Sequence, residues 1–205
     1  MTNDIEGFIL AGGANSRMGS RKAALQLNGR TFVQIARSSL SEITNKIRVI
    51  GEKEDCIADD GLEWVPDICS EEKSSLLGLA TALTNCKMPL AFVLACDLPF
   101  VTGDLLERIA SFCSGDADAV VPVQPDGRLQ PLCALYRRDA CLEKAMEMLK
   151  TGKRSLHSLV RCLNPRLVEF SEISDLADSD LFFTNINTPA DFEASQDIIS
   201  RVASD

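Results

Sequence analysis

The sequence predicts an α/β fold: a single three-layer α/β/α domain built on a Rossmann-like, mostly parallel mixed sheet. Short apolar segments alternate with segments whose apolar residues recur at helical spacing, which indicates parallel strands joined by crossover helices. A glycine-rich stretch follows the first apolar segment, as in doubly wound sheets that bind a ligand beyond their strand ends. The chain has 205 residues, which fits one ordinary domain. We therefore expect residues 1–205 to form one domain.

The first half of the chain alternates regularly between the two kinds of segment. In residues 31–43, for example, Phe32, Ala36, Leu40 and Ile43 fall on one face, as in an amphipathic helix. The predicted elements of this half are strands at 5–10, 46–51 and 89–96 and helices at 31–43 and 76–86.

The second half adds an antiparallel feature. Residues 118–123 and 130–136 flank Pro125-Asp126-Gly127, a turn signal, and predict a hairpin. Such a hairpin makes the sheet mixed. The other predicted elements are a helix at 102–113 capped by Thr102, a helix at 139–150 ended by Gly152, a strand at 182–185 and a helix at 189–202.

Charge and hydropathy exclude several classes of protein. The net charge is −9, whereas binding to duplex nucleic acid needs clustered lysine and arginine. The longest apolar runs are far below the ~20 residues that cross a bilayer. The first residues do not have the pattern of a secretory signal. We expect a cytoplasmic protein that binds neither nucleic acid nor a membrane.

The cysteines indicate reduced thiols. There are eight, without a C-x-x-C pair, and the chain has one histidine, His157. Zinc and iron–sulfur sites usually show paired ligand spacings, so we expect the cysteines to pack as small apolar residues. We expect His157 to be a surface or pocket-lining side chain, since no acidic partner is suggested by its spacing.

The glycine-rich stretch 10–22 has the chemistry of an anion site. Gly12 and Gly13 allow close backbone approach, and successive amides can form an anion-binding concavity. Arg17 and Lys22 add positive charge, and the combination suits a triphosphate. The spacing matches neither a P-loop nor a dinucleotide fingerprint. The alternative is an ordinary glycine-rich turn with surface cations.

Asp97 directly follows the most apolar predicted strand. A carboxylate at that place lies at the rim of the ligand site, and such hard oxygen ligands hold Mg²⁺ together with phosphate oxygens. Strand alternation puts Cys96 on the opposite face, in the core. The alternative for Asp97 is a loop residue or a helix cap.

Four motifs together carry a family resemblance. They are L-A-G-G-x-x-S-R-M-G-x-x-K from Leu10, C-D-L-P-F from Cys96, Q-P-L-C-A-L-Y from Gln130 and N-I-N-T-P from Asn185. In this order they resemble the MobA-type molybdenum cofactor guanylyltransferases, within the nucleoside-triphosphate transferase superfamily. The resemblance covers residues 7–192.

The resemblance implies a fold of the nucleotide-diphospho-sugar transferase type and a Mg²⁺-dependent reaction. GMP would pass from GTP to the terminal phosphate of molybdopterin, giving molybdopterin guanine dinucleotide and pyrophosphate. GTP and molybdopterin would be the substrates, and molybdoenzymes or other proteins of cofactor biosynthesis would be further partners.

The resemblance also assigns roles to single residues. Asp97 would bind the metal, and Lys22, Arg17 and Asp97 would carry catalysis. The nucleotide would contact Leu10, Ala11, Gly12, Gly13, Lys22, Asp67 and Asp97. The pterin substrate would contact Asn185, Asn187, Gln130 and Arg154. On local signal alone, Asn185 and Asn187 could instead cap the helix that begins at Pro189.

Two details bear on the choice of base. Members of the family often carry G-P-L-x-G after the mid-chain acid, where this chain has Ser74-Ser75-Leu76-Leu77-Gly78. Similar cytidylyltransferases read L-A-A-G where this chain reads L-A-G-G, so Gly12 leaves room for a purine, an effect of about 1–3 kcal/mol. The alternatives are CMP transfer to molybdopterin, nucleotide transfer to a sugar phosphate or polyol phosphate, and a non-catalytic nucleotide or cofactor carrier.

Overall fold

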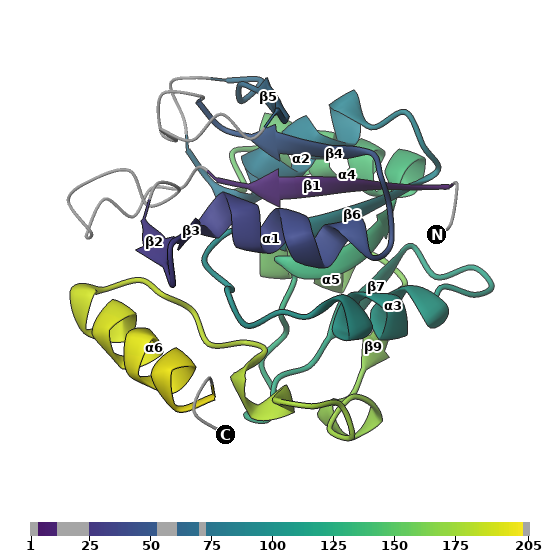
Figure 1. Cartoon of the computed structure of the whole chain (residues 1–205). Coiled ribbons are helices and arrows are strands. Elements are labelled where there is room, and N and C mark those ends of the chain that lie inside the picture. The colour runs from purple at the N-terminus through teal and green to yellow at the C-terminus, as the bar shows by residue number, and fades with distance from the viewer. Residues whose placement is uncertain (1–3, 12–24, 53–60, 70–72, 203–205) are drawn as a thin grey trace.

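The computed structural model describes residues 4–11, 25–52, 61–69 and 73–202. Seven strands form one sheet in the order β5-β4-β1-β6-β8-β7-β9 (Figure 1). Their bounds are β1 Ile5–Leu10, β4 Ile47–Ile50, β5 Glu63–Val65, β6 Leu90–Ala95, β7 Ala119–Pro122, β8 Cys133–Arg137 and β9 Pro165–Val168. A small hairpin of β2 (Gln26–Leu27) and β3 (Arg30–Thr31) stands apart.

The sheet is mixed, as predicted, because a single strand of the seven runs against the others. β8 lies between β6 and β7 and is antiparallel to both, whereas β5, β4, β1 and β6 are mutually parallel and β9 is parallel to β7. Leu10 pairs with Ile50 on one side and with Ala95 on the other. The carboxyl ends of β4, β1 and β6 therefore lie level with one another.

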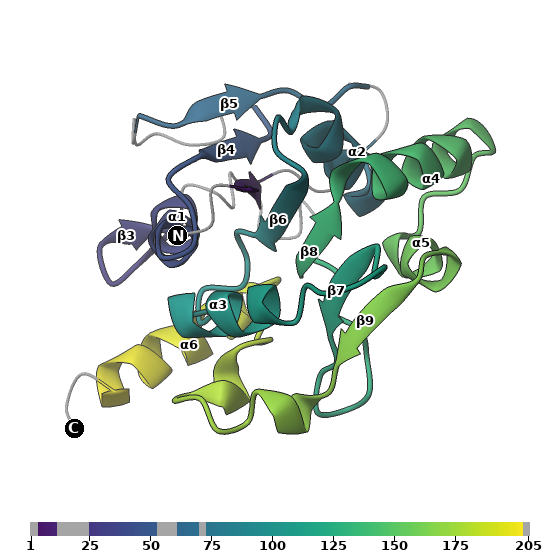
Figure 2. The same cartoon turned by 90° about the vertical axis from the view of Figure 1, so that its right-hand side faces the viewer.

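Helices cover both faces of the sheet and make the three predicted layers (Figure 2). One face carries α1 (Phe32–Ser41), α3 (Gly103–Ser111) and α6 (Pro189–Val202). The other carries α2 (Ser75–Asn85), α4 (Arg138–Lys150) and α5 (Leu156–Cys162). Each face has its own apolar core, one built on α1 and α3 and one on α2, α4 and α5.

Most predicted elements are present within a few residues of their expected bounds. Thr102 is the N-cap of α3, and its side chain accepts a hydrogen bond from the Leu105 amide. Gly152 follows α4 with a φ of 77°, a backbone conformation that glycine adopts at low cost. The predicted helix stripe of α1 is buried at Phe32, Ala36 and Leu40.

The strand predicted at 182–185 is wrong. Residues Ser179–Leu181 form a 3₁₀ turn, and the turn continues through Phe182 and Phe183. A strand would send these neighbouring rings to opposite faces. The turn instead directs both into one core, where the ring centroids lie 6.4 Å apart. The apolar residues Phe182 and Phe183 thus belong to a turn and not to a strand.

The short strands β2, β3, β5 and β9 and the 3₁₀ turn Phe170–Glu172 were not predicted. The β2–β3 hairpin turns at Asn28-Gly29, whose φ angles of 51° and 74° suit a type I′ turn. β5 has three residues, and β9 begins with Pro165 at the edge of the sheet. Strands this short carry little periodicity, and their pairing partners are distant in sequence.

No helix in the described ranges is both long enough and apolar enough to cross a membrane. The seven cysteines of those ranges are free thiols: Cys69, Cys86, Cys96, Cys113, Cys133, Cys141 and Cys162. Cys86, Cys96, Cys133 and Cys141 are buried, as expected of small apolar residues, whereas Cys162 is exposed, against that expectation. Cys56 lies outside the described residues.

Candidate functional site

The candidate site lies where four parallel strands end, at the left of Figure 1. Backbone hydrogen bonds continue the ladder just past the strand ends. The amide of Ala11 donates to the Ile50 carbonyl (2.9 Å), and the amide of Cys96 donates to the Leu10 carbonyl (3.1 Å). The two segments singled out in the sequence, after β1 and after β6, are thus neighbours at this edge.

Asp97 stands immediately beyond the end of β6. Its neighbour Cys96 is 4% exposed and packs in the core, as the strand alternation predicted. Asp97 itself is half-buried, and its Oδ1 atom is buried. Its main-chain carbonyl accepts a hydrogen bond from the amide of Ile186 (3.0 Å). A C-terminal segment is therefore fastened directly to the end of β6.

This contact brings Asn185 and Asn187 to the same edge, since they flank Ile186, which is fully buried. The helix cap is supplied by Thr188, whose hydroxyl accepts from the Asp191 amide (3.2 Å). Asp191 Oδ2 in turn accepts from the amides of Asn187 (2.9 Å) and Thr188 (2.8 Å). The alternative in which the asparagines cap α6 is therefore wrong.

Asp67 follows β5 at this edge of the sheet. Its Oδ1 lies 3.3 Å from the hydroxyl of Thr81 on α2, and that hydroxyl accepts from the Ile68 amide (3.2 Å). Partial burial raises the pKa of the Asp67 carboxyl above its usual value, and the Thr81 hydrogen bond and the charge of Lys73 oppose this shift. A role for Thr81 was not predicted from the sequence, because a threonine within an apolar helix is usually a core residue.

Leu10 is the last residue of β1 and supports the start of α2. A Cβ placed on Gly78 would lie 3.4 Å from Leu10 Cδ1, so the helix packs closely on this side chain. Ser74 is the N-cap of α2 and accepts from the Leu77 amide (3.1 Å). Ser74 thus begins α2 in the ordinary way although the G-P-L-x-G pattern is absent, and a Cβ on Gly78 would lie at ordinary van der Waals distance from Leu10.

Gln130 lies on the same edge. Its amide donates to the Pro122 carbonyl (2.9 Å), and the nearby Leu132 carbonyl accepts from the amide of Ala95 (2.8 Å). The Gln130 residue is 6% exposed. The segment that contains it runs past the end of β6, next to Asp97.

Arg154 lies in the connection between α4 and α5. Its Nη1 donates to the carbonyls of Leu149 (2.9 Å) and Lys153 (3.1 Å), at the end of α4. α4 begins at the amino edge of the sheet, where the Arg138 amide donates to the Pro89 carbonyl (2.9 Å). Thirteen helical residues span about 20 Å, so the end of α4 lies toward the carboxyl edge.

Four predicted site residues lie outside the described residues: Gly12, Gly13, Arg17 and Lys22. Their contacts with a triphosphate stay predictions. His157, by contrast, is exposed on α5, as the simpler interpretation expected.

The carboxylates, thiols and imidazole of the described residues bear on a metal site. Among the described residues, no group of three or more His, Cys, Asp or Glu side chains is placed to hold a metal ion. Mg²⁺ differs from zinc in this respect, since it is commonly held by one or two carboxylates together with substrate phosphates and water. The carboxylate of Asp97 at the strand ends fits that donor set.

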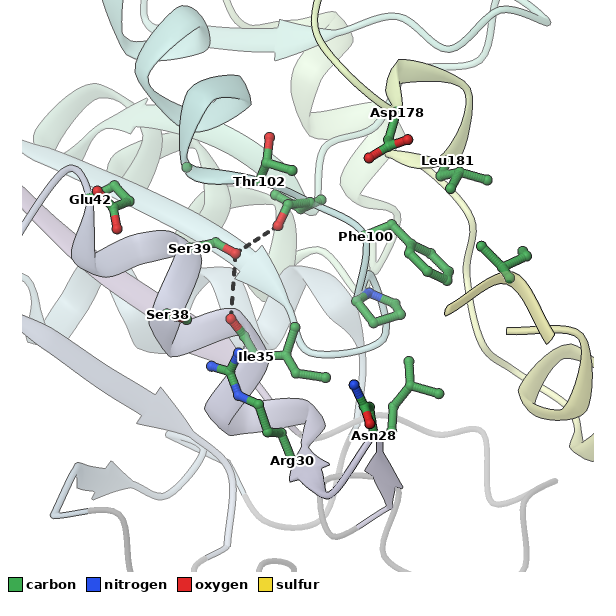
Figure 3. Close-up of a pocket in the computed structure, with 15 residues that line it drawn as sticks. Asn28, Arg30, Ile35, Ser38, Ser39, Glu42, Phe100, Thr102, Asp178 and Leu181 are labelled. Atoms are coloured by element: carbon green, nitrogen blue, oxygen red, sulfur yellow. Dashed lines mark hydrogen bonds between the residues drawn. The ribbon is translucent and has the colours of Figure 1, made fainter. Parts of the chain in front are cut away.

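A separate groove of about 530 Å³ opens between α1, α3, α6 and the loop that follows Asp97 (Figure 3). Ser39 donates to the Val101 carbonyl (2.6 Å) and holds this loop against α1. Among the described residues, the groove is lined by none of the predicted site residues, and its charged side chains are Arg30, Glu42 and Asp178. One cation against two anions does not suit a triphosphate.

Several known proteins resemble this chain over most of its length. A probable molybdenum cofactor guanylyltransferase from Geobacillus sp. (strain WCH70) is 29% identical over 93% of this chain and 97% of the relative. One from Pelotomaculum thermopropionicum is 30% identical over 90% and 88%. The crystal structure of molybdopterin-guanine dinucleotide biosynthesis protein A from Archaeoglobus fulgidus has the same fold, with a TM-score of 0.77, 21% identity and coverage of 96% and 99%.

The family assignment rests on a profile match over most of the chain. Residues 7–169 match the model of the MobA-like NTP transferase domain. The match begins within β1 and ends just after β9, so it includes all seven strands of the sheet. The chain belongs to the MobA-like NTP transferase family.

Proposed function

We propose that this protein transfers GMP from GTP to the terminal phosphate of molybdopterin and releases pyrophosphate. The observation that carries the proposal is the hydrogen bond from the Ile186 amide to the Asp97 carbonyl, because it joins a candidate nucleotide edge to a candidate pterin segment. The names of the full-length relatives support the same reaction.

The nucleotide would bind along the ends of β5, β1 and β6. The residues that we assign to it are Leu10, Ala11, Gly12, Gly13, Lys22, Asp67 and Asp97. The buried Leu10 and the raised pKa of Asp67 support a partly desolvated pocket there. Guanine is the favoured base, since Gly12 leaves room for a purine.

The pterin substrate would lie on the other side of Asp97. We assign Asn185, Asn187, Gln130 and Arg154 to it. The Thr188–Asp191 capping box supports this assignment, because it fixes the backbone that carries Asn187 without using an asparagine as the cap.

The reaction joins two anions. An oxygen of the terminal phosphate of molybdopterin attacks the α-phosphorus of GTP and forms a new P–O bond. The bond from that phosphorus to the oxygen that bridges to the β-phosphate breaks, and pyrophosphate leaves with the electron pair. The nucleophile is already ionised at neutral pH, so no general base is needed. Arg17 and Lys22 would hold the triphosphate in line and offset the charge of the leaving group.

Asp97 is the residue that we propose to hold Mg²⁺. A divalent ion held by this carboxylate would supply positive charge that reduces the repulsion between the two anionic substrates. The protein's own contribution is the placement of the carboxylate at the end of a buried strand. We place the reaction in the cytoplasm, where reduced cysteines are the rule.

The test is a product analysis. Purified protein, Mg²⁺ and molybdopterin are incubated with GTP or CTP. Pyrophosphate release is measured first, and the product is then identified by mass spectrometry. Molybdopterin guanine dinucleotide is the expected product. A cytosine product would overturn the choice of base, and nucleotide binding with no product from either triphosphate would contradict transfer to molybdopterin.

A further inference from the structure

Thr81 on α2 makes an unusual set of contacts. The residue is fully buried, and its hydroxyl donates to the Leu77 carbonyl one turn back (2.9 Å). The same oxygen accepts a hydrogen bond from the Ile68 amide (3.2 Å) and lies 3.3 Å from Asp67 Oδ1, so its single proton is shared between the Leu77 carbonyl and the Asp67 carboxylate. One hydroxyl thus joins a helix to both the side chain and the backbone of the segment that follows β5.

The next turn of the same helix offers a comparison. Thr84 makes the same bond within the helix, from its hydroxyl to the Ala80 carbonyl (2.7 Å), yet it is exposed. A bond to the preceding turn therefore does not require burial. What distinguishes Thr81 is its contact with Asp67 and Ile68.

Burial makes the Thr81 hydroxyl important for the energy of this segment. A hydroxyl removed from water costs free energy unless its hydrogen bonds are satisfied, and valine has nearly the same shape without that cost. The contacts of the Thr81 hydroxyl therefore offset the free-energy cost of burying it. One of the groups that it contacts, the Asp67 carboxylate, is partly desolvated, and a hydrogen bond to a charged group is stronger than one between neutral groups.

We propose that Thr81 is a positioning residue that fixes the Asp67 carboxylate for binding of the guanine nucleotide. This inference rests on the proposed role of Asp67. Thr81 itself does not touch the reacting atoms. Its hydroxyl holds the 67–68 backbone against α2, so that the carboxylate faces the strand ends in one orientation before the nucleotide arrives.

Three variants separate the hydroxyl from the rest of the side chain. Thr81→Val removes the hydroxyl and keeps the shape, Thr81→Ser keeps the hydroxyl, and Thr84→Val is the matched control on the same helix. We expect Thr81→Val to raise the KM for GTP about 10-fold, with kcat and the KM for molybdopterin within about twofold of wild type. Thr81→Ser and Thr84→Val should behave like the wild type.

Two kinetic results would overturn the proposal. One is an unchanged KM for GTP in a folded Thr81→Val protein. The other is an equal defect in Thr81→Ser, because the lost methyl group and not the hydroxyl would then be responsible. Thermal unfolding of each variant establishes that the proteins compared are folded.

A second measurement does not depend on the reaction. The pKa of Asp67 is followed by NMR of its carboxyl carbon, with Lys73, Glu52 and Thr81 as the groups that act on it. Thr81→Val should raise this pKa and Thr84→Val should not. An unchanged pKa overturns the contact itself. A raised pKa in a protein that makes no product contradicts the proposed function but not the contact.

Discussion

At the scale of single residues, Asp97 carries most of the proposed chemistry. Its carbonyl binds the Ile186 amide, and its carboxylate lies at the end of β6 with Oδ1 buried. The sequence predicts this placement well, since a carboxylate directly after a strongly apolar strand must lie at the strand end. Thr81 could not be predicted, because its importance depends on a partner fourteen positions away across a loop.

Asp97→Asn tests the metal role. The substitution keeps the shape but removes the negative charge that attracts Mg²⁺, so we expect turnover to fall at least about 100-fold, with little change in the melting temperature. Asp178→Asn is a suitable control, because Asp178 lies by the groove with a φ of 58°, which asparagine tolerates. Near-normal Mg²⁺-dependent turnover in Asp97→Asn would rule out this role.

Asp67→Asn tests the electrostatics of the nucleotide edge. Burial raises the pKa of Asp67 above its usual value of 3.8, so the folded state favours the protonated form. The favourable contribution of Asp67 to the free energy of unfolding is complete below pH 3.8. It is lost as the pH rises through the pKa that Asp67 has in the folded protein. Without ligand, Asp67→Asn should therefore melt at a higher temperature than wild type at pH 7, and the difference should shrink as the pH falls below 3.8.

The measurement is thermal unfolding over this pH range, with nucleotide binding followed in parallel. We expect Asp67→Asn to bind GTP more weakly although it is no less stable. A variant that is less stable than wild type at pH 7 would show that ionised Asp67 stabilises the fold, against the direction of its pKa shift.

At the scale of elements, strand ends and helix starts position the site. The helices α1 and α3 were predictable because their periodic apolar residues define one buried face, and β6 was predictable because it is an unbroken apolar run. Phe182 and Phe183 misled the prediction because a turn can bury two neighbouring rings where a strand cannot. β9 depends on its pairing with β7, which the local sequence does not reveal.

Gly103 tests how closely α1 and α3 approach each other. A Cβ on Gly103 would lie 2.4 Å from Cγ and 2.8 Å from Cβ of Glu42, so the two helices must shift to admit it. We expect Gly103→Ala to lower the free energy of unfolding by about 1–3 kcal/mol. Adding Glu42→Ala should restore part of the lost stability. The free energies of unfolding are measured by urea denaturation.

The control for this prediction is Ser111→Ala, at the exposed far end of α3, which should change stability by less than about 0.5 kcal/mol. Gly103→Ala with wild-type stability would mean that the helices adjust to the methyl group without cost.

At the scale of the whole molecule, the two edges of the sheet have different chemistry. Near the amino edge, Arg48 and Glu6 form a buried ion pair (3.0 Å), and Glu6 also accepts from the Lys87 amide (2.7 Å). The carboxyl edge gathers Asp67, Asp97 and the segment around Ile186. The fold class and this edge could be predicted from the order of strands and motifs, whereas the helix-to-loop contacts could not.

We propose that GTP binds at the carboxyl ends of β5, β1 and β6 and not in the groove by α6. Hydrogen–deuterium exchange of the full chain, with and without GTP and Mg²⁺ and with no molybdopterin, tests this most directly. We predict slower exchange at the amides of Ala11, Ile68 and Asp97, and unchanged exchange at Phe100 and Leu181. Protection confined to Phe100 and Leu181 would contradict the account.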